Sequence, residues 1–336
     1  MNTKPVNLII DTDAGVDDSQ ALICALRLTH NYNLLAITTC DGNCGLENVN
    51  RNVARVSLAC NTTHIPIVSG CHEPLVKVIP KHNALYVHGK DGLGDVNWDT
   101  ELNGSFSNSK LPHPISTPAA IYLIEQAREH AGNLDIIAIG PVTNLALALK
   151  LDPTFSSNVR RVFLMSGSLT DTGNVTKLAE FNAFSDPEAL FEVCEGFSDI
   201  QLVTWETTLS HTVSWEFYDK LCNLGTPMSE FFKLISKKTA EFVSKELKVG
   251  WTLPDPLTMI VALFPHVIEE SEQVSVTVCL SGTERGRTIK GKVGKAVELL
   301  WNEEGEESDK GGKMNVCYVK KMNLGLIESV LEESLR

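Results

Sequence analysis

The sequence contains no hydrophobic run long enough to cross a membrane and no pair of cysteines spaced as C-x-x-C. A transmembrane helix needs ~20 consecutive apolar residues, and the apolar run 6–10 is far shorter, with no leader-like segment before it. The nine cysteines are odd in number and several lie within apolar runs, so we expect free thiols rather than a disulfide framework. These absences predict a cytoplasmic protein in a reducing compartment.

Basic residues are scarce relative to acidic ones, 29 Lys and Arg against 42 Asp and Glu, which gives a formal net charge of −13. An acidic surface repels nucleic-acid phosphates and anionic lipids, so neither is expected as a partner. A neutral or cationic small molecule, or a metal ion, suits this charge better. The 336 residues show no internal boundary, and we predict a single domain spanning 1–336.

Strand-like apolar runs alternate with stretches of helical periodicity through the first two thirds of the chain. This alternation predicts an open, mostly parallel, Rossmann-like α/β sheet with helices on both faces. The predicted strands are 6–10, 34–39, 65–69, 134–139, 162–165 and 200–204, and the predicted helices are 18–28, 46–60, 117–130, 144–149 and 186–194.

The last third has a different pattern. An amphipathic helix is predicted over 229–247. The segments 274–280, 297–301 and 316–319 predict an antiparallel addition to the sheet, with the polar run 303–313 as a solvated hairpin tip between the last two.

Four aspartates, Asp11, Asp13, Asp17 and Asp18, follow the first predicted strand within eight residues. Carboxylates this close together repel one another strongly unless a cation lies between them. Carboxylates, carbonyls and waters are the ligands that calcium and magnesium prefer. Aspartates also cap helix N-termini, but one or two suffice for that role. The loops 41–43 and 140–141 are expected at the same edge of the sheet, where α/β sheets bind ligands.

This segment, read as Asp11-x-Asp13-x-Gly15-x-Asp17-Asp18, resembles the N-terminal signature of the inosine/uridine-type nucleoside hydrolases. Five further blocks follow in family order: 37–43, 87–94, 139–146, 179–189 and 255–256. The resemblance implies calcium-dependent cleavage of the N-glycosidic bond of ribonucleosides to free base and ribose. It also implies a homo-oligomer, a dimer or a tetramer.

The resemblance further implies how the metal site is built. Asp13 would hold Ca²⁺ and act as the general base on a bound water, and Asp11 would support it. Asp18, Asp255 and the backbone carbonyl of Ile139 would complete the protein ligands. Such a cation lowers the pKa of its water and grips the vicinal ribose hydroxyls, while the sugar develops oxocarbenium character.

The substrate contacts follow from the same resemblance. Asp17 would bind the ribose 2′-hydroxyl, Asn182 the ribose hydroxyls, and Asn174 and Glu180 the 5′-hydroxyl, with Asn43 lining the ribose site. Each has a plainer alternative. Asn43 and Asn174 lie near glycines and could be turn residues, and Glu180 could be a surface charge.

Four other positions carry weaker signals. His88 could line the base pocket or be a loop histidine bonded to the backbone. Trp251 could stack on a purine, which would favour purine nucleosides, or be a packed tryptophan. For Thr143-Asn144 we favour a helix cap.

Two positions depart from the family pattern. Ala14 replaces a proline, and we expect Gly15 to permit the tight turn. Pro254 stands where well-studied members have a histidine that is proposed to protonate the leaving base, and where purine-preferring members have a tryptophan. Proline cannot donate a proton, so the leaving-group acid and the nucleobase preference stay open.

Two competing functions agree with part of the pattern. A protein that binds nucleosides without useful turnover would keep the metal and ribose residues, although it would not need Asp13 as a base. A haloacid-dehalogenase-type phosphohydrolase also has an Asp-x-Asp motif after a strand. That family prefers threonine or valine at the position of Gly15.

Overall fold

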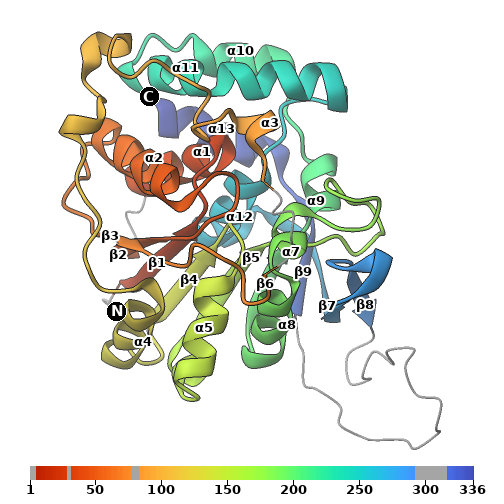
Figure 1. Cartoon of the computed structure of the whole chain (residues 1–336). Coiled ribbons are helices and arrows are strands. Elements are labelled where there is room, and N and C mark those ends of the chain that lie inside the picture. The colour runs from red at the N-terminus through yellow and green to blue at the C-terminus, as the bar shows by residue number, and fades with distance from the viewer. Residues whose placement is uncertain (1–4, 29–31, 78–82, 292–315) are drawn as a thin grey trace, which may run out of the picture.

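The structure is a computed structural model that describes residues 5–28, 32–77, 83–291 and 316–336. Within these residues, nine strands form one sheet in the order β3-β2-β1-β4-β5-β6-β9-β7-β8 (Figure 1). The strands are β1 (Val6–Thr12), β2 (Tyr32–Thr39), β3 (Ile67–Ser69), β4 (Leu134–Ala138), β5 (Arg161–Met165), β6 (Ile200–Val203), β7 (Ile268–Val278), β8 (Thr288–Gly291) and β9 (Val316–Met322).

The pairing of the strands confirms a mostly parallel sheet with an antiparallel addition. Every pair from β3 across to β9 is parallel, and β7 is antiparallel to both β9 and β8. The strand β9, which contains 316–319, pairs with β6 and β7. The segments 297–301 and 303–313 lie outside the described residues.

Helices cover both faces of the sheet, as predicted, with α4, α5 and α8 on one side and α1, α2, α12 and α13 on the other (Figure 1). The short helices α3, α6 and α7 and the helices α9, α10, α12 and α13 were not predicted. The helices are α1 (Val16–Leu28), α2 (Leu46–Ala59), α3 (Leu85–His88), α4 (Ala119–Glu129), α5 (Thr143–Leu151), α6 (Phe155–Asn158), α7 (Phe181–Ser185), α8 (Pro187–Gly196), α9 (Trp205–Ser210), α10 (Trp215–Cys222), α11 (Pro227–Phe242), α12 (Pro254–Leu263) and α13 (Leu324–Leu335). A π-helical turn, Val243–Leu247, continues α11.

The alternation of side chains along β1 separates two hydrophobic cores. Leu8 and Ile10 belong to the core beneath α1 and α12, whereas Ile9 belongs to the core beneath α4, α5 and α8. All three side chains are fully buried, because successive residues of a strand point to opposite faces and both faces of this sheet are covered.

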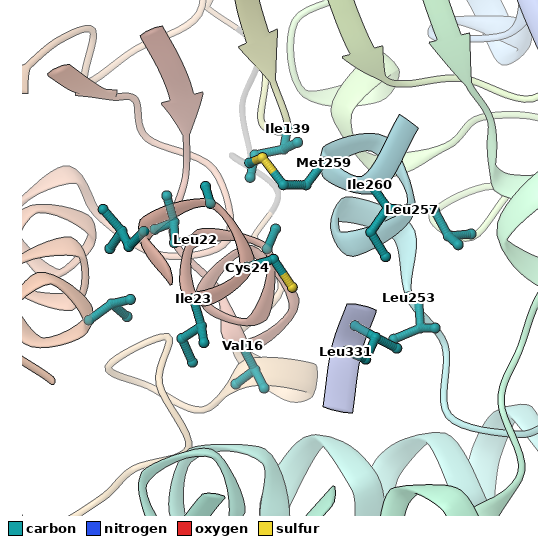
Figure 2. Close-up of a cluster of buried hydrophobic side chains, with 14 of the residues drawn as sticks. Val16, Leu22, Ile23, Cys24, Ile139, Leu253, Leu257, Met259, Ile260 and Leu331 are labelled. Atoms are coloured by element: carbon teal, nitrogen blue, oxygen red, sulfur yellow. The ribbon is translucent and has the colours of Figure 1, made fainter. Parts of the chain in front are cut away.

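Helix α12 is the most deeply buried helix of the site region, since every one of its residues is buried. Leu257 and Ile260 belong to the same buried cluster as Leu22 and Ile23 of α1 (Figure 2). Each such side chain contributes roughly 2 kcal/mol when it is buried. The prolines of α12, Pro254 and Pro256, stand in its first turn, where no backbone N–H is needed for a hydrogen bond within the helix. This packing fixes the start of the helix, and therefore Asp255, against the sheet.

In the described part of the chain, no helix combines the length and the apolar character that crossing a bilayer requires.

Candidate active site

Three loops at the carboxyl ends of β1, β2 and β4 converge on Asp13. A Cβ atom added at Gly42 would lie 2.1 Å from Asp13 Oδ2, and one added at Gly140 would lie 2.8 Å from Asp13 Oδ1. Both backbones therefore approach the carboxylate more closely than any side chain permits. The three polar loops that the sequence placed at one edge of the sheet do meet there.

The turn after β1 differs from expectation. Ala14, not Gly15, has a positive φ, of 30°. Gly15 is needed for a close approach instead, because a Cβ atom there would lie 2.7 Å from Asn43 Nδ2 and 3.1 Å from His88 Cε1.

The aspartates form a buried cluster with Asp255. Asp11, Asp13 and Asp18 are fully buried, and Asp255 nearly so. Asp17, Asp18 and Asp255 each offer an oxygen atom within 4.8 Å of the other two. Asp13 lies within hydrogen-bonding reach of Asp18. This group of three contains Asp17 and two of the aspartate ligands expected from the resemblance, Asp18 and Asp255, and the third, Asp13, adjoins it through Asp18.

The cluster has no compensating positive charge in the described chain. Burial raises the pKa of Asp11 to about 7 and that of Asp17 to about 6. Burial and the charge of Asp18 raise the pKa values of Asp13 and Asp255 well above the usual range. Asp11 Oδ2, Asp13 Oδ1 and Asp17 Oδ1 are buried and have no hydrogen-bond partner among the described residues. Orphaned oxygens of this kind fit a hard divalent cation.

Short hydrogen bonds orient the carboxylates. Asp18 accepts hydrogen bonds from Thr12 Oγ1 (2.6 Å), the Gly15 amide (2.8 Å) and Asn43 Nδ2 (2.9 Å). The Asn43 amide donates to Asp13 Oδ2 at 2.7 Å. Asn43 therefore does more than form a turn, because it holds two of the aspartates through its backbone and its side chain.

Asn144 supports the cluster in a way that the sequence interpretation missed. Its Nδ2 donates to Asp11 Oδ1 (2.8 Å) and to the Thr39 carbonyl (2.9 Å), and its Oδ1 accepts from the Cys71 amide (2.9 Å). The predicted cap at Thr143-Asn144 was wrong, since α5 has no side-chain cap. In the sequence, the signal for this supporting role was the position of Asn144 within the block 139–146, close to Gly140-Pro141.

His88 lies in the site as a neutral side chain. Its Nδ1 accepts a hydrogen bond from the Val16 amide at 3.2 Å, which assigns the ring proton to Nε2. Nε2 lies 3.7 Å from Asp17 Oδ1. Burial lowers the pKa of His88 to about 4. The ring is bonded to the backbone, as the plainer alternative predicted, and it also lines the cavity described next.

A cavity of about 150 Å³ adjoins the carboxylate cluster. The fully buried Asp11, Asp13 and Asp18 are not part of its wall. The other predicted site residues are brought together around it: Asp17, Asn43, His88, Ile139, Asn174, Glu180, Asn182, Trp251 and Asp255.

Glu180 and Asn182 lie at the start of α7. Glu180 is buried and accepts hydrogen bonds from the Gly167 amide and the Asn182 amide, both at 2.8 Å, so it is not a surface charge. Burial raises its pKa to about 7. Asn182 Nδ2 donates to the carbonyls of Ile139 (3.2 Å) and Met165 (3.0 Å), which joins the ends of β4 and β5.

Trp251 touches the cavity, but most of its contacts belong to the core. Its indole N–H donates to Gln20 Oε1 at 3.0 Å, and its ring centroid lies 4.9 Å from that of Tyr218. It is 1% exposed. These contacts favour the packing role of Trp251 over the stacking one.

Part of the cavity lining is apolar and carries few proton donors. Tyr86 and Phe242, whose rings meet edge to face with centroids 5.5 Å apart, line the cavity together with the apolar residues Val243, Leu247 and Pro254. Among the described residues that line the cavity, Tyr86 alone carries a phenolic hydroxyl group. The sequence interpretation did not single it out, although it lies two residues before His88.

Comparisons with known proteins agree with this arrangement. Residues 8–326 match the family model described as "Inosine-uridine preferring nucleoside hydrolase". A probable uridine nucleosidase 2 of Arabidopsis thaliana is 33% identical and covers 84% of each chain. An inosine-uridine preferring nucleoside hydrolase of Leishmania major is 30% identical over 83% of this chain and 85% of its own length.

Solved structures of similar proteins have the same fold. A plant nucleoside hydrolase, PpNRh1, superposes with a TM-score of 0.85 and 28% identity, over 98% of this chain and 99% of its own. An inosine-guanosine nucleoside hydrolase gives a TM-score of 0.82 and 28% identity, over 98% of each chain.

Proposed function

The chain belongs to the inosine-uridine preferring nucleoside hydrolase family and is therefore an N-ribosyl hydrolase that splits ribonucleosides into base and ribose, and we propose that it uses a Ca²⁺ ion held by its carboxylate cluster. One observation carries the proposal: buried aspartates with unpartnered oxygens adjoin a cavity lined by polar side chains. The family match also removes the haloacid-dehalogenase alternative.

We assign the metal ligands to Asp13, Asp18, Asp255 and the Ile139 carbonyl, and Asp17 offers a further oxygen at the same place. A bound Ca²⁺ ion lowers the pKa of its water and neutralises the carboxylates. Asp13 is suited to act as the general base, because the Asn43 amide holds its Oδ2 while its Oδ1 has no partner among the described residues and can receive a proton.

We assign the ribose to the part of the cavity next to Asp17. Asp17 would accept a hydrogen bond from the 2′-hydroxyl, and Asn182 would contact the ribose hydroxyls. Asn174 and Glu180 would contact the 5′-hydroxyl, and Asn43 would line the same space. All five residues line the same cavity, which supports this assignment.

The base would then occupy the apolar part of the cavity, next to Tyr86 and Phe242. Tyr86 is our candidate for donating a proton to the leaving base, because Pro254 cannot donate one. The slight purine preference expected from Trp251 stays a prediction. Similar proteins are named for uridine as well as for inosine and guanosine. A single domain, a homo-oligomer and a cytoplasmic location also stay proposals.

The test is release of free base from inosine, uridine, adenosine and guanosine, each with Ca²⁺ and with a chelator. We expect calcium-dependent release that falls at least ~10²-fold in Asp13→Asn. Binding of nucleosides without release of base from any of the four would instead support the nucleoside-binding alternative.

A further inference from the structure

The loop 168–179 lies between β5 and α7 and carries Asn174. Little of this loop is packed against the rest of the protein. Most residues between its ends are exposed or half-buried. The amides of Asn174 and Val175 both donate to the carbonyl of Ala179, each at 3.2 Å. The position of Asn174 therefore depends on where Ala179 is held.

Arg287 and Thr288, at the start of β8, hold both ends of this loop, which lies beside β8 in Figure 1. Arg287 forms an isolated antiparallel bridge with Ala179 at one end. At the other end, Thr288 Oγ1 accepts a hydrogen bond from the Ser168 amide at 2.8 Å and donates one to the Ser168 carbonyl at 2.6 Å. The ends of the loop are thus fixed by a strand that is distant in sequence and lines no part of the cavity.

The side chain of Arg287 adds a third attachment. Its Nε and Nη2 donate to the two carboxylate oxygens of Asp171 at 2.8 and 3.0 Å, and its Nη1 donates to Glu284 at 3.0 Å. A two-point arrangement of this kind fixes direction as well as distance. Asp171 has a φ of 58°, a left-handed conformation that non-glycine residues seldom adopt, so an external contact helps to keep it there.

We propose that Arg287 is a positioning residue for the substrate: its side chain holds Asp171 while its backbone holds Ala179, and together they fix the loop 168–179 so that Asn174 can contact the 5′-hydroxyl of a nucleoside. The substitution Arg287→Ala removes the side-chain contact alone. The inference rests on the proposed function for the role of Asn174. Arg287 touches no residue of the carboxylate cluster in the described chain, so its effect concerns binding of the 5′ end rather than attack at the anomeric carbon.

The experiment compares Arg287→Ala with the unaltered protein on the better of inosine and uridine, and on the 5′-deoxy analogue of that nucleoside. We expect KM for the natural nucleoside to rise about five-fold, the scale of a partly exposed ion pair, with little change in kcat. KM for the 5′-deoxy analogue should change by less than about two-fold. Asp171→Asn should give the same selective effect, and it decides the question if Arg287→Ala does not fold.

The matched control is Arg285→Ala. Arg285 stands in the same turn but donates to Glu188 on α8, at 2.7 Å through Nη2, and to the carbonyl of Leu280. The substitution Arg285→Ala should leave the ratio of KM for the natural nucleoside to KM for its 5′-deoxy analogue unchanged. Equal KM effects of the Arg285 and Arg287 variants, or equal effects on both substrates, would overturn the inference.

Asn174→Ala separates this inference from the proposed function. If it removes the preference for the 5′-hydroxyl while Arg287→Ala does not, only the positioning role fails. If Asn174→Ala has no effect either, or if the unaltered protein releases no base, the assignment of the 5′ contact or of the reaction itself fails, and the positioning role fails with it.

Discussion

Binding of a divalent cation should stabilise this fold, and it should do so much more at pH 8 than at pH 5. In the cation-free protein, burial raises the pKa of Asp11 to about 7 from a usual value of 3.8. A carboxyl group whose pKa is higher in the folded state adds stability below its unfolded pKa, and this stability is lost as the pH rises through the folded pKa. At ~1.4 kcal/mol per pH unit, the contribution of Asp11 to the free energy of unfolding falls by about 4 kcal/mol between pH 4 and pH 7.

A cation offsets this loss, because its charge favours the ionised form of Asp11 and of the proposed ligands Asp13 and Asp255, whose pKa values burial and the charge of Asp18 also raise. At a free concentration one hundred times its dissociation constant, it adds ~2.7 kcal/mol. A chain of 336 residues has an unfolding entropy of about 0.7 kcal/mol/K, so the melting temperature should rise by about 4 °C at pH 8. At pH 5 the same cation should raise it by less than about 1 °C.

Thermal unfolding with Ca²⁺ and with a chelator, at each pH and at equal ionic strength, measures this difference. Asp255→Asn should abolish the rise at pH 8. Asp199→Asn, which alters a surface carboxylate paired with Arg161, should preserve it. An equal rise at pH 5 and pH 8 would refute the reasoning, because the cation would then be bound somewhere other than the buried cluster.

Three further substitutions test the surroundings of the cluster. Gly42→Ala places a Cβ atom 2.1 Å from Asp13 Oδ2 and should lower base release at least ~10²-fold, whereas Gly45→Ala, with nothing within 4 Å, should retain activity. Asn144→Ala should lower the free energy of unfolding in urea by about 3 kcal/mol, since it leaves buried partners unsatisfied; a loss below ~1 kcal/mol would contradict its supporting role. Trp251→Phe should cost about 2 kcal/mol of stability and change KM for inosine less than about two-fold. A large rise in KM at unchanged stability would restore the stacking role.

The strands and the carboxylate cluster were predictable because their signals are local. Ile9 and its neighbours form a continuous apolar run, which is typical of a strand covered on both faces. The spacing of Asp13, Asp17 and Asp18 places them in one turn and the helix that follows, and the positions of Gly42 and Gly140 after other strands place them at the same edge.

The remaining features depend on contacts that have no local signal. Helix α12 is buried on all sides and opens with Pro254 and Pro256, so it shows neither the polar face nor the composition by which a helix is usually identified. Asn144 has the sequence context of a helix cap, and only the fold brings it to Asp11. Likewise, Arg287 and Asp171 are far apart in sequence, and their contact follows from the pairing of distant segments.

The position of β9 bears on how the sheet is assembled during synthesis. It is the last described strand along the chain, yet it lies between β6 and β7, which it joins. Until the ribosome has released β9, the parallel strands and the β7–β8 pair each present an unpaired edge, and such edges promote association between chains. The nascent protein therefore has an aggregation-prone interval that closes only when the strand that emerges last inserts into the interior of the sheet.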